Sequence, residues 1–463
     1  MMRISLVLFA LMMVPKAASA YETDVIVNGI RYNVNTITRT AEVTSYDNSY
    51  TGDVVITSSV SFDGVACSVT SVGENAFRLC SDLTSVSIPS SVKSIGFSAF
   101  QYCTKLASVS LPSGVTSIGD NVFDGCSVLT SIDIPNGVKT IGESAFQNCS
   151  SLTSINIPNS VTSLGNYAFA SSGLTSVIIP TSIKSLGDHV FYNCSGLASV
   201  SIPSSVTSIG TEAFSICTKL ASVSIPSSVT SIGNGAFRQT GLTSIDIPSS
   251  VMSIEEKAFY YCTDLTSVNI SEGVKSIGSS AFEFCEGLTS VSIPSSVTSI
   301  GYGAFGYCGA ITTLEVNIET PLPLDSWTFA FCYNVATLYV PEGSKALYEA
   351  AENWSSFGSM IAEMPRCATP TISYANGKVL FACDTEGVEF VPTMSCAPKQ
   401  SLEGNEMEVG GTYDISVYAK KQGYSNSSVA TKTISANKMG DLNGDGEVNV
   451  TDVTSMVSRI LNQ

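Results

Sequence analysis

A phenylalanine recurs every 22 to 24 residues through most of this 463-residue chain. Its twelve positions are Phe77, Phe100, Phe123, Phe146, Phe169, Phe191, Phe214, Phe237, Phe259, Phe282, Phe305 and Phe329. The segments between them repeat one pattern, close to LTSVxIPSSVTSIGxxAFxxCxx. A unit this short cannot bury an apolar face by itself, so it must stack on the units before and after it. The repeat therefore predicts a solenoid of about twelve coils over residues 67–341.

Each repeat contains a stretch in which apolar and polar residues alternate. In LTSVSIP, Val86 and Ile88 point to one side of an extended chain, whereas Ser85 and Ser87 point to the other. Pro89 ends the stretch, because proline lacks the N–H that a strand ladder uses. One short strand per unit, with a period in the low twenties, is typical of leucine-rich-repeat solenoids. We therefore expect a mainly β fold with about one such strand per coil.

Most coils carry a cysteine three residues after the phenylalanine. The ten positions are Cys80, Cys103, Cys126, Cys149, Cys194, Cys217, Cys262, Cys285, Cys308 and Cys332. Lone cysteines one repeat apart lack the clustered spacing of a zinc site. Stacked equivalents have parallel Cβ vectors about 4.8 Å apart, outside the usual disulfide separation of about 3.5 to 4.5 Å, although an oxidising compartment keeps pairing between neighbours open. We favour buried free thiols that pack as small apolar groups.

Two coils lack this cysteine and are one residue shorter than most. They read FASSGL after Phe169 and FRQTGL after Phe237, with Gly173 and Gly241 before the leucine. We expect these glycines to close a shorter turn at positive φ, without a side chain pointing inward.

Residues 1–20 have the organisation of a secretory signal peptide. Arg3 precedes the apolar run ISLVLFALMMV, and Ala18-Ser19-Ala20 supplies the small residues of a cleavage site. The run is shorter than the roughly 20 residues that a membrane-spanning helix needs, and no later segment reaches that length. The sequence predicts a secreted or cell-surface chain without a transmembrane segment.

Charge and the scarcity of histidine exclude several functions. The chain has 22 Lys+Arg against 39 Asp+Glu and a formal net charge of -17, which opposes binding to nucleic acid or anionic lipid. Its one histidine, His189, is expected on an exposed loop with no partner for a nucleophile, and Glu255-Glu256 is a charge cluster on a turn. We predict that the protein is not an enzyme.

The outward strand positions form the candidate binding surface. They are mostly serine, and their second column includes four residues with stronger polar groups: Asp133, Asn156, Asp246 and Asn269. The surface contains few aromatic residues, whereas tight protein interfaces favour Trp, Tyr and Arg. Two interpretations remain open: a ligand-binding face, or short polar side chains that only solvate a sheet.

The C-terminal segment has the ligand spacing of a calcium loop. In DLNGDGEVNVTD, loop positions 1, 3, 5, 7, 9 and 12 are Asp441, Asn443, Asp445, Glu447, Asn449 and Asp452. Gly446 at position 6 allows the turn, and Glu447 contributes its backbone carbonyl. An apolar helix face follows from Val453 to Leu461. We expect residues 439–463 to bind one Ca²⁺.

Residues 367–438 change character. The segments TISYANGKVLFAC, VEFVPTMSC and TYDISVYAKKQGYSNSSVATKTIS alternate like strands, and Asn376-Gly377 is typical of a hairpin turn, so they predict a β-sandwich. Cys367, Cys383 and Cys396 form an odd set, of which Cys383 and Cys396 could pair.

The repeat IPSSVTSIGxxAFxxC resembles the BspA-type leucine-rich repeat of bacterial surface proteins. VNGIRYNV and TGDVVI resemble that family's N-terminal capping strands over 21–66, with Asn28-Gly29 as the turn, and VPEGSKALYEAAENW resembles its C-terminal helical cap over 342–366. The resemblance implies an adhesin-like protein whose solenoid face binds an extracellular protein or glycan ligand.

Two further resemblances concern the C-terminal segments. YDISVYAKKQGYSNS resembles the immunoglobulin-like domain of many surface proteins, a non-catalytic spacer. Asp452 at position 12 and the missing entry helix resemble one repeat of a type I dockerin, the segment that binds cohesin modules. Dockerins normally carry two repeats, so a cohesin-like partner, dimerisation and local docking all remain open. The alternative function is a carbohydrate-directed, non-catalytic subunit of a cohesin–dockerin assembly that degrades polysaccharide.

Overall fold

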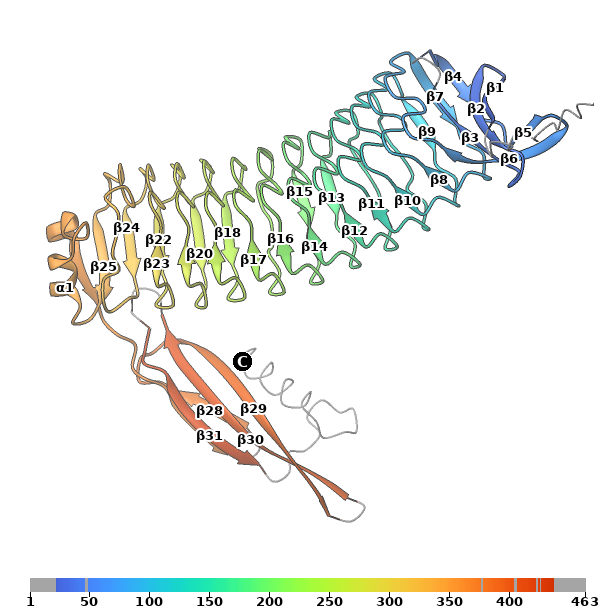
Figure 1. Ribbon diagram of the computed structural model, residues 1–463. Helices are drawn as coiled ribbons and strands as arrows, with labels where there is room; N and C mark the ends of the chain where they lie inside the picture. Colours follow the sequence, from blue (N-terminus) through green and yellow to red (C-terminus); the bar gives the residue numbers. More distant parts are fainter. Residues whose placement is uncertain are drawn as a thin grey trace, which may run out of the picture. The chain divides into compact units, whose positions relative to one another are not determined.

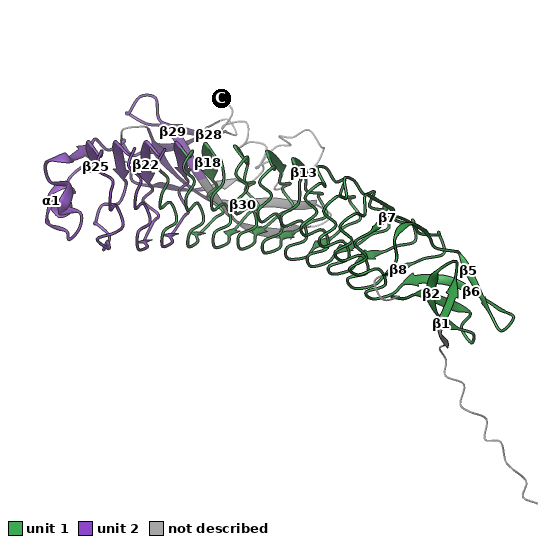
Figure 2. Cartoon of the chain, turned by 90° about the horizontal axis from the view of Figure 1, so that it is seen from above, with its two compact units in different colours: residues 1–265, 280–285 green, residues 266–279, 286–463 purple. Residues whose placement is uncertain are grey.

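The computed structural model describes residues 22–45, 49–375, 378–403, 406–421, 424 and 426–436 (Figure 1). The predicted signal peptide over 1–20 and the predicted calcium ligands from Asp441 to Asp452 lie outside these residues. The protein is mainly β, with a β-solenoid of about 13 turns and very little helix. It divides into two compact units, coloured in Figure 2: residues 1–265 with 280–285 (unit 1), and residues 266–279 with 286–463 (unit 2).

Unit 1 begins with a capping sheet that contains the expected VNGIRYNV segment but not TGDVVI, whose strand pairs with the first coil strands instead. The capping sheet has the strand order β1-β2-β3-β6-β5, formed by β1 (Glu22–Val27), β2 (Ile30–Asn35), β3 (Thr40–Val43), β5 (Ser59–Phe62) and β6 (Val65–Val72). Val27 pairs with Ile30, so Asn28 and Gly29 form a two-residue hairpin turn with φ values of 52° and 77°. Both values are positive, as the turn that matches strand twist requires. The predicted hairpin is confirmed.

The solenoid has one coil more than the phenylalanine count indicates. Before Phe77, the ring of Tyr50 takes the place of a phenylalanine, with its centroid 4.8 Å from that of Phe77. The strand β4 (Gly52–Val55) follows Tyr50 and pairs in parallel with β7 (Leu83–Ser87). The repeat pattern did not indicate this coil, because tyrosine replaces the recurring phenylalanine there.

The alternating stretches form parallel strands with the expected faces. In unit 1 they are β4, β7, β9 (Ser108–Ser110), β13 (Ser176–Ile178), β15 (Ser199–Ser201) and β18 (Ser244–Ile247). Val86 and Val109 are buried, whereas Ser87 and Ser110 are exposed and paired with each other. The expectation of one such strand in every coil is wrong for residues 131–134 and 154–157, which share only an isolated parallel bridge between Asp133 and Asn156. It is also wrong for residues 222–225, which form no strand.

A second row of strands, which the sequence did not predict, follows the proline corner. In unit 1 it consists of two-residue strands: β8 (Ser94–Ile95), β10 (Ser117–Ile118), β11 (Thr140–Ile141), β12 (Ser163–Leu164), β14 (Ser185–Leu186), β16 (Ser208–Ile209), β17 (Ser231–Ile232) and β19 (Ser253–Ile254). Parallel pairs such as Ile118–Ile141 keep the buried residues in register. Two residues are too few for an alternation signal.

The phenylalanine segment forms the third side of each coil. Rings from Phe77 to Phe282 are fully buried, and the ring pairs along this column lie 5.1 to 5.5 Å apart and within 14° of parallel. The residues two before and two after the ring adopt positive φ in most coils, such as Ser98 at 52° and Tyr102 at 59°. This alternation lets every second N–H bond to the next coil, as Phe100 N does to Val122 O at 2.9 Å.

Unit 2 continues the same repeat and ends in a cap. Its strands are β20 (Ser267–Ile270), β22 (Ser290–Ile293), β24 (Thr313–Val316), β25 (Thr337–Pro341) and β26 (Ile361–Met364) in one row, with β21 (Ser276–Ile277) and β23 (Ser299–Ile300) in the other. The cap contains α1 (Lys345–Ala350) and the 3₁₀ helix η1 (Ser355–Met360), so the helices predicted within 342–366 are present. Trp354 is buried there and donates its Nε1–H to Leu322 O at 2.7 Å.

The remaining strands of unit 2 are antiparallel. β27 (Thr371–Ala375) pairs with β28 (Lys378–Ala382), and a second sheet has the order β29 (Glu389–Glu403), β30 (Glu406–Lys420), β31 (Ala430–Ala436). The predicted strand-rich character of 367–438 is confirmed, whereas the closed sandwich stays a prediction. Cys383 is a free thiol whose Sγ lies 3.0 Å from Ala368 O, so it does not form the disulfide considered from the sequence.

Candidate ligand-binding face

The outward strand positions form two columns of side chains, here called the strand face, and all of them are exposed except the half-buried Ser85, Thr313 and Glu315. The first column contains Ser85, Ser108, Ser131, Ser154, Ser176, Ser199, Ser222 and Ser244 in unit 1, and Ser267, Ser290 and Thr313 in unit 2. The second contains Ser87, Ser110, Asp133, Asn156, Ile178, Ser201, Ser224 and Asp246, and then Asn269, Ser292 and Glu315. Direct pairing keeps equivalents in line, as in Ser176–Ser199 and Ser290–Thr313. Equivalent groups therefore repeat about every 4.8 Å.

The four predicted ligand residues are all exposed on this face. Asp133 and Asn156 form the parallel bridge between neighbouring coils, so the structure brings these two together. Asp246 lies on β18 of the same unit, four coils after Asn156 along the chain. Asn269 lies on β20 of unit 2. A carboxylate beside an amide offers acceptors and donors one strand apart, which suits a ligand with hydroxyl or amide groups.

Sequence reasoning missed an acidic residue at the start of the face. Asp53 pairs with Ser85 in the parallel ladder and belongs to the first column. Its Oδ1 accepts hydrogen bonds from Thr84 Oγ1 at 2.9 Å and Ser85 Oγ at 2.5 Å, and these bonds hold the pKa of its carboxyl below the ordinary value. Its signal was a strand pattern, GDVVI, that follows Tyr50 rather than an Ala-Phe pair.

The face also has two exposed apolar positions. Val55 is 66% exposed and Ile178 is 75% exposed, both in the second column. Isolated exposed apolar side chains are common on protein surfaces and define no hydrophobic site by themselves.

The cysteine column is internal and contributes no ligand atoms to the face. The solenoid cysteines are free and mostly fully buried, and Cys103 Sγ donates to Phe77 O of the preceding coil at 3.0 Å. Burial raises the pKa of the Cys194 and Cys262 thiols to about 11. The interpretation as buried thiols is confirmed for the described cysteines.

The two coils without cysteine correct a second expectation. Ser172 and Thr240 occupy the cysteine position, are buried, and approach the next cysteines, with Ser172 Oγ 3.3 Å from Cys194 Sγ and Thr240 Oγ1 3.2 Å from Cys262 Sγ. A small side chain therefore does point inward. Gly173 is not at positive φ; a Cβ there would lie 2.2 Å from Ser150 O, so close approach to the preceding coil requires glycine.

His189 is half-buried rather than exposed. Its ring stacks on Tyr167 with centroids 4.3 Å apart, and its Nε2 lies 3.8 Å from Glu212 Oε2. These contacts give it a packing role on a turn. Within the described residues, no cluster of three or more His, Cys, Asp and Glu side chains could hold a metal ion.

The sequence matches the BspA type leucine rich repeat region over residues 70–198, 184–312 and 252–357, more than half of the chain. The protein therefore belongs to the BspA-type leucine-rich repeat family. Proteins of this family are typically bacterial surface proteins, and leucine-rich repeat proteins are generally non-catalytic binding scaffolds. Among the described residues, no helix is long and apolar enough to cross a membrane.

Solved structures include similar solenoids. A leucine-rich repeat protein from Bacteroides ovatus is 28% identical, with a TM-score of 0.53, and the match covers 74% of this chain and 100% of that one. A leucine rich cell surface protein from Faecalibacterium prausnitzii is 24% identical, with a TM-score of 0.44, over 73% and 99% of the two chains. No curated protein matches the sequence.

Proposed function

We propose that the protein is a secreted or cell-surface, adhesin-like binding protein whose strand face binds an extracellular protein or glycan ligand. The observation that carries the proposal is the exposure of polar side chains at equivalent positions of successive coils, including Asp133 beside Asn156. Such a face presents many weak contacts at fixed spacing, and their sum can bind an extended partner. Family membership supports a position on the bacterial surface.

The strand face is tested by replacing its four strongest polar groups. Other coils carry serine at the same position, for example Ser201 and Ser224, so D133S, N156S, D246S and N269S together keep the repeat pattern. Binding to immobilised collagen, fibronectin and a glycan array is measured by surface plasmon resonance or fluorescence. We expect the fourfold variant to lose binding to at least one of the protein or glycan ligands that the unchanged protein binds.

The matched control removes two carboxylates outside the strand face. Glu143 and Glu286 are exposed, and other coils carry serine at their positions, as Ser279 and Ser81 show. The E143S/E286S protein should bind like the unchanged protein. Unchanged binding by the fourfold strand-face variant would refute the proposal.

The proposed second part is a tail, residues 439–463, that binds one Ca²⁺ and serves attachment or assembly. The alternating ligands Asp441, Asn443 and Asp445 with Gly446 support it, because this spacing matches an EF-hand-type loop. In a full-length protein, D441A/D445A should abolish calcium uptake measured by calorimetry. Unchanged uptake would refute the site.

The dockerin-like pattern also supports the alternative function, a non-catalytic carbohydrate-directed subunit of a cohesin–dockerin assembly. The two functions differ in what the tail captures. Residues 438–463 on a carrier would serve as bait for envelope and secreted proteins, with and without calcium and with the D441A/D445A control. Calcium-dependent capture of a cohesin-like protein would favour the alternative; no capture would leave the tail as a local calcium loop.

A further inference from the structure

Exposed aromatic side chains gather around the last phenylalanine coil of unit 2. Trp327 is 41% exposed, Phe331 37% and Tyr333 81%. The Phe331 ring lies nearly parallel to that of Tyr307 at 4.2 Å and meets Tyr333 edge-on at 5.7 Å. The rings therefore support one another, although they are not buried in the core.

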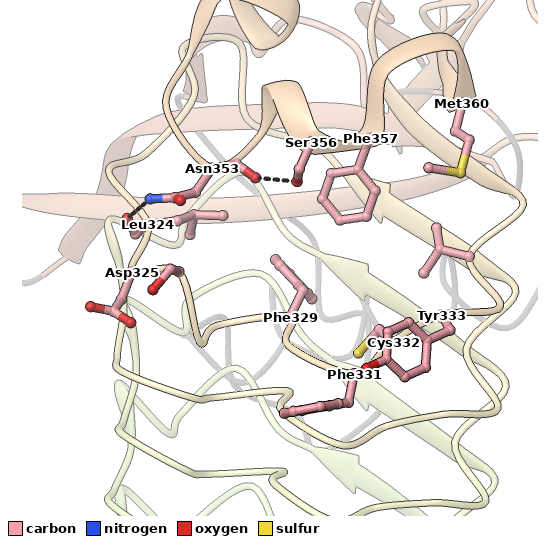
Figure 3. A pocket seen from close by; sticks show the side chains of 12 residues that line it. Leu324, Asp325, Phe329, Phe331, Cys332, Tyr333, Asn353, Ser356, Phe357 and Met360 are labelled. Atoms are coloured by element: carbon pink, nitrogen blue, oxygen red, sulfur yellow. Dashed lines mark hydrogen bonds between the residues drawn. The ribbon is translucent and has the colours of Figure 1, made fainter.

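Two of these rings, Phe331 and Tyr333, border a cavity of about 380 Å³, here called the cap pocket (Figure 3). Phe329, Phe331 and Tyr333 line it from the coil, and Phe357 lines it from η1. Phe329 is the last ring of the phenylalanine column and is only half-buried, whereas Phe305 is fully buried. The core column thus ends in an accessible aromatic wall.

Fixed polar groups occupy the other side of the cap pocket. Asn353 Nδ2 donates to Leu324 O at 2.8 Å, and Ser356 Oγ donates to Asn353 O at 2.7 Å. Asp325 is exposed at the rim and accepts the Trp327 N–H through Oδ1 at 2.9 Å. These bonds hold an amide, a hydroxyl and a carboxylate beside the rings.

The backbone at Phe331 is held in a costly conformation. Its φ is 64°, a region that bulky residues rarely adopt, and the equivalent positions in other coils hold Asn148 and Asn193. Asparagine tolerates this conformation more easily than phenylalanine. Leu79, Ile216 and Phe284 occupy the same position of other coils with a φ of 63°, so this conformation belongs to the repeat, and what distinguishes Phe331 is its place beside the cap pocket.

We propose that the cap pocket binds a neutral saccharide unit of a glycan. The C–H face of a sugar ring can pack on aromatic rings, while its hydroxyls donate to the Asp325 carboxylate and the Asn353 amide oxygen. None of the described residues that line the pocket is Lys or Arg, so an anionic ligand would meet a carboxylate without a compensating cation. The volume falls within the range of about 300 to 1,000 Å³ typical of small-ligand sites.

The cap pocket is separate from the strand face, because no residue that lines it belongs to either strand column. This site goes beyond the function proposed above, and the two can fail independently. A partner protein is the competing occupant, since exposed Trp and Tyr are also common in protein interfaces. The polar groups fixed beside the aromatic wall favour the sugar.

The test uses substitutions that other coils already contain. F331N copies Asn148 and Asn193, and Y333S copies Ser127 and Ser150 at the same coil positions. Y102N is the matched control, because Tyr102 is equally exposed, at 40%, and has the same positive φ but does not line the pocket. The full-length proteins are applied to an array of neutral and acidic glycans, and affinity for the best-bound oligosaccharide is then titrated by tryptophan fluorescence.

We expect the unchanged protein, Y102N and the fourfold strand-face variant to bind a neutral glycan, and F331N/Y333S to bind it at least about tenfold more weakly. If F331N/Y333S melts at a lower temperature, the affinity of Y333S alone decides the test, because the Tyr333 side chain is mostly exposed and its replacement should not disturb folding. No glycan binding, binding of acidic glycans only, or an affinity unchanged in Y333S and F331N/Y333S would overturn the proposal. Loss of a protein partner in these variants without glycan binding would also overturn it and assign the pocket to that partner.

Discussion

At the scale of single residues, the same residue type has different roles at different positions of the coil. Ser228 Oγ donates to Val206 O of the preceding coil at 2.7 Å, and Ser296 Oγ donates to Val274 O at 2.7 Å, so these corner serines join coils. Ser224, only four residues before Ser228, is exposed on the strand face. The sequence predicts which strand serines point outward from their alternation, but it cannot predict the corner bonds, because they depend on how coils stack.

Gly173 provides a test of the corrected turn. G173A should lower the free energy of unfolding by about 1 to 3 kcal/mol, because the new Cβ would collide with a backbone carbonyl of the preceding coil. Gly309 occupies the same coil position with nothing within 4 Å, so G309A should leave stability unchanged or slightly higher. Urea unfolding measures both. Equal stability of the two variants would contradict this explanation.

The thiols provide a second residue-scale prediction. At pH 8 the native protein should react very slowly with a thiol reagent, because burial protects the solenoid sulfurs and raises the pKa of Cys194 and Cys262 from 9.0 to about 11. After denaturation without reductant, at least 13 of the 14 cysteines should react. A colorimetric thiol assay gives both counts. A denatured count several thiols lower would indicate disulfides and refute the free-thiol column.

At the scale of the coil, the sequence predicted two sides of each coil, the strand and the phenylalanine segment, because their side chains follow a regular pattern. The strand beginning at Leu83 and the buried ring of Phe100 follow from alternation and from the repeat. The second row of strands and the positive φ at Tyr102 could not be predicted from the sequence, since they arise from hydrogen bonds between coils rather than from local preference. The half-buried Phe329 at the cap was equally hidden, because its exposure depends on how the cap packs against the last coil.

The phenylalanine column should dominate coil stability. F191A removes a fully buried ring that stacks at 5.5 Å on each neighbour and should cost about 3 to 5 kcal/mol. Phe97 is 48% exposed, and F97A should change stability by no more than about 0.5 kcal/mol. Thermal and urea unfolding compare the two proteins. A cost for F191A no larger than that for F97A would contradict the role of the column.

At the scale of the whole molecule, the repeat alone predicted the fold class and the exposure of the strand-face side chains, because both depend on the period of the sequence. The chain divides into two compact units between residues 265 and 286, inside the solenoid. The four predicted face residues are exposed, and Asp53 and the cap pocket add groups that no motif indicated. Pockets form from side chains of several segments, so a one-dimensional pattern does not reveal them.

The central claim, that the strand face is the binding surface, is tested most directly by carboxylate footprinting of the protein with its bound ligand. A carbodiimide labels exposed carboxylates, and mass spectrometry compares labelling with and without ligand. We predict protection of Asp133 and Asp246, with unchanged labelling of Glu143 and Glu286, which are exposed elsewhere on the coils. Protection of Glu143 or Glu286, with Asp133 and Asp246 labelled as in the free protein, would contradict the claim.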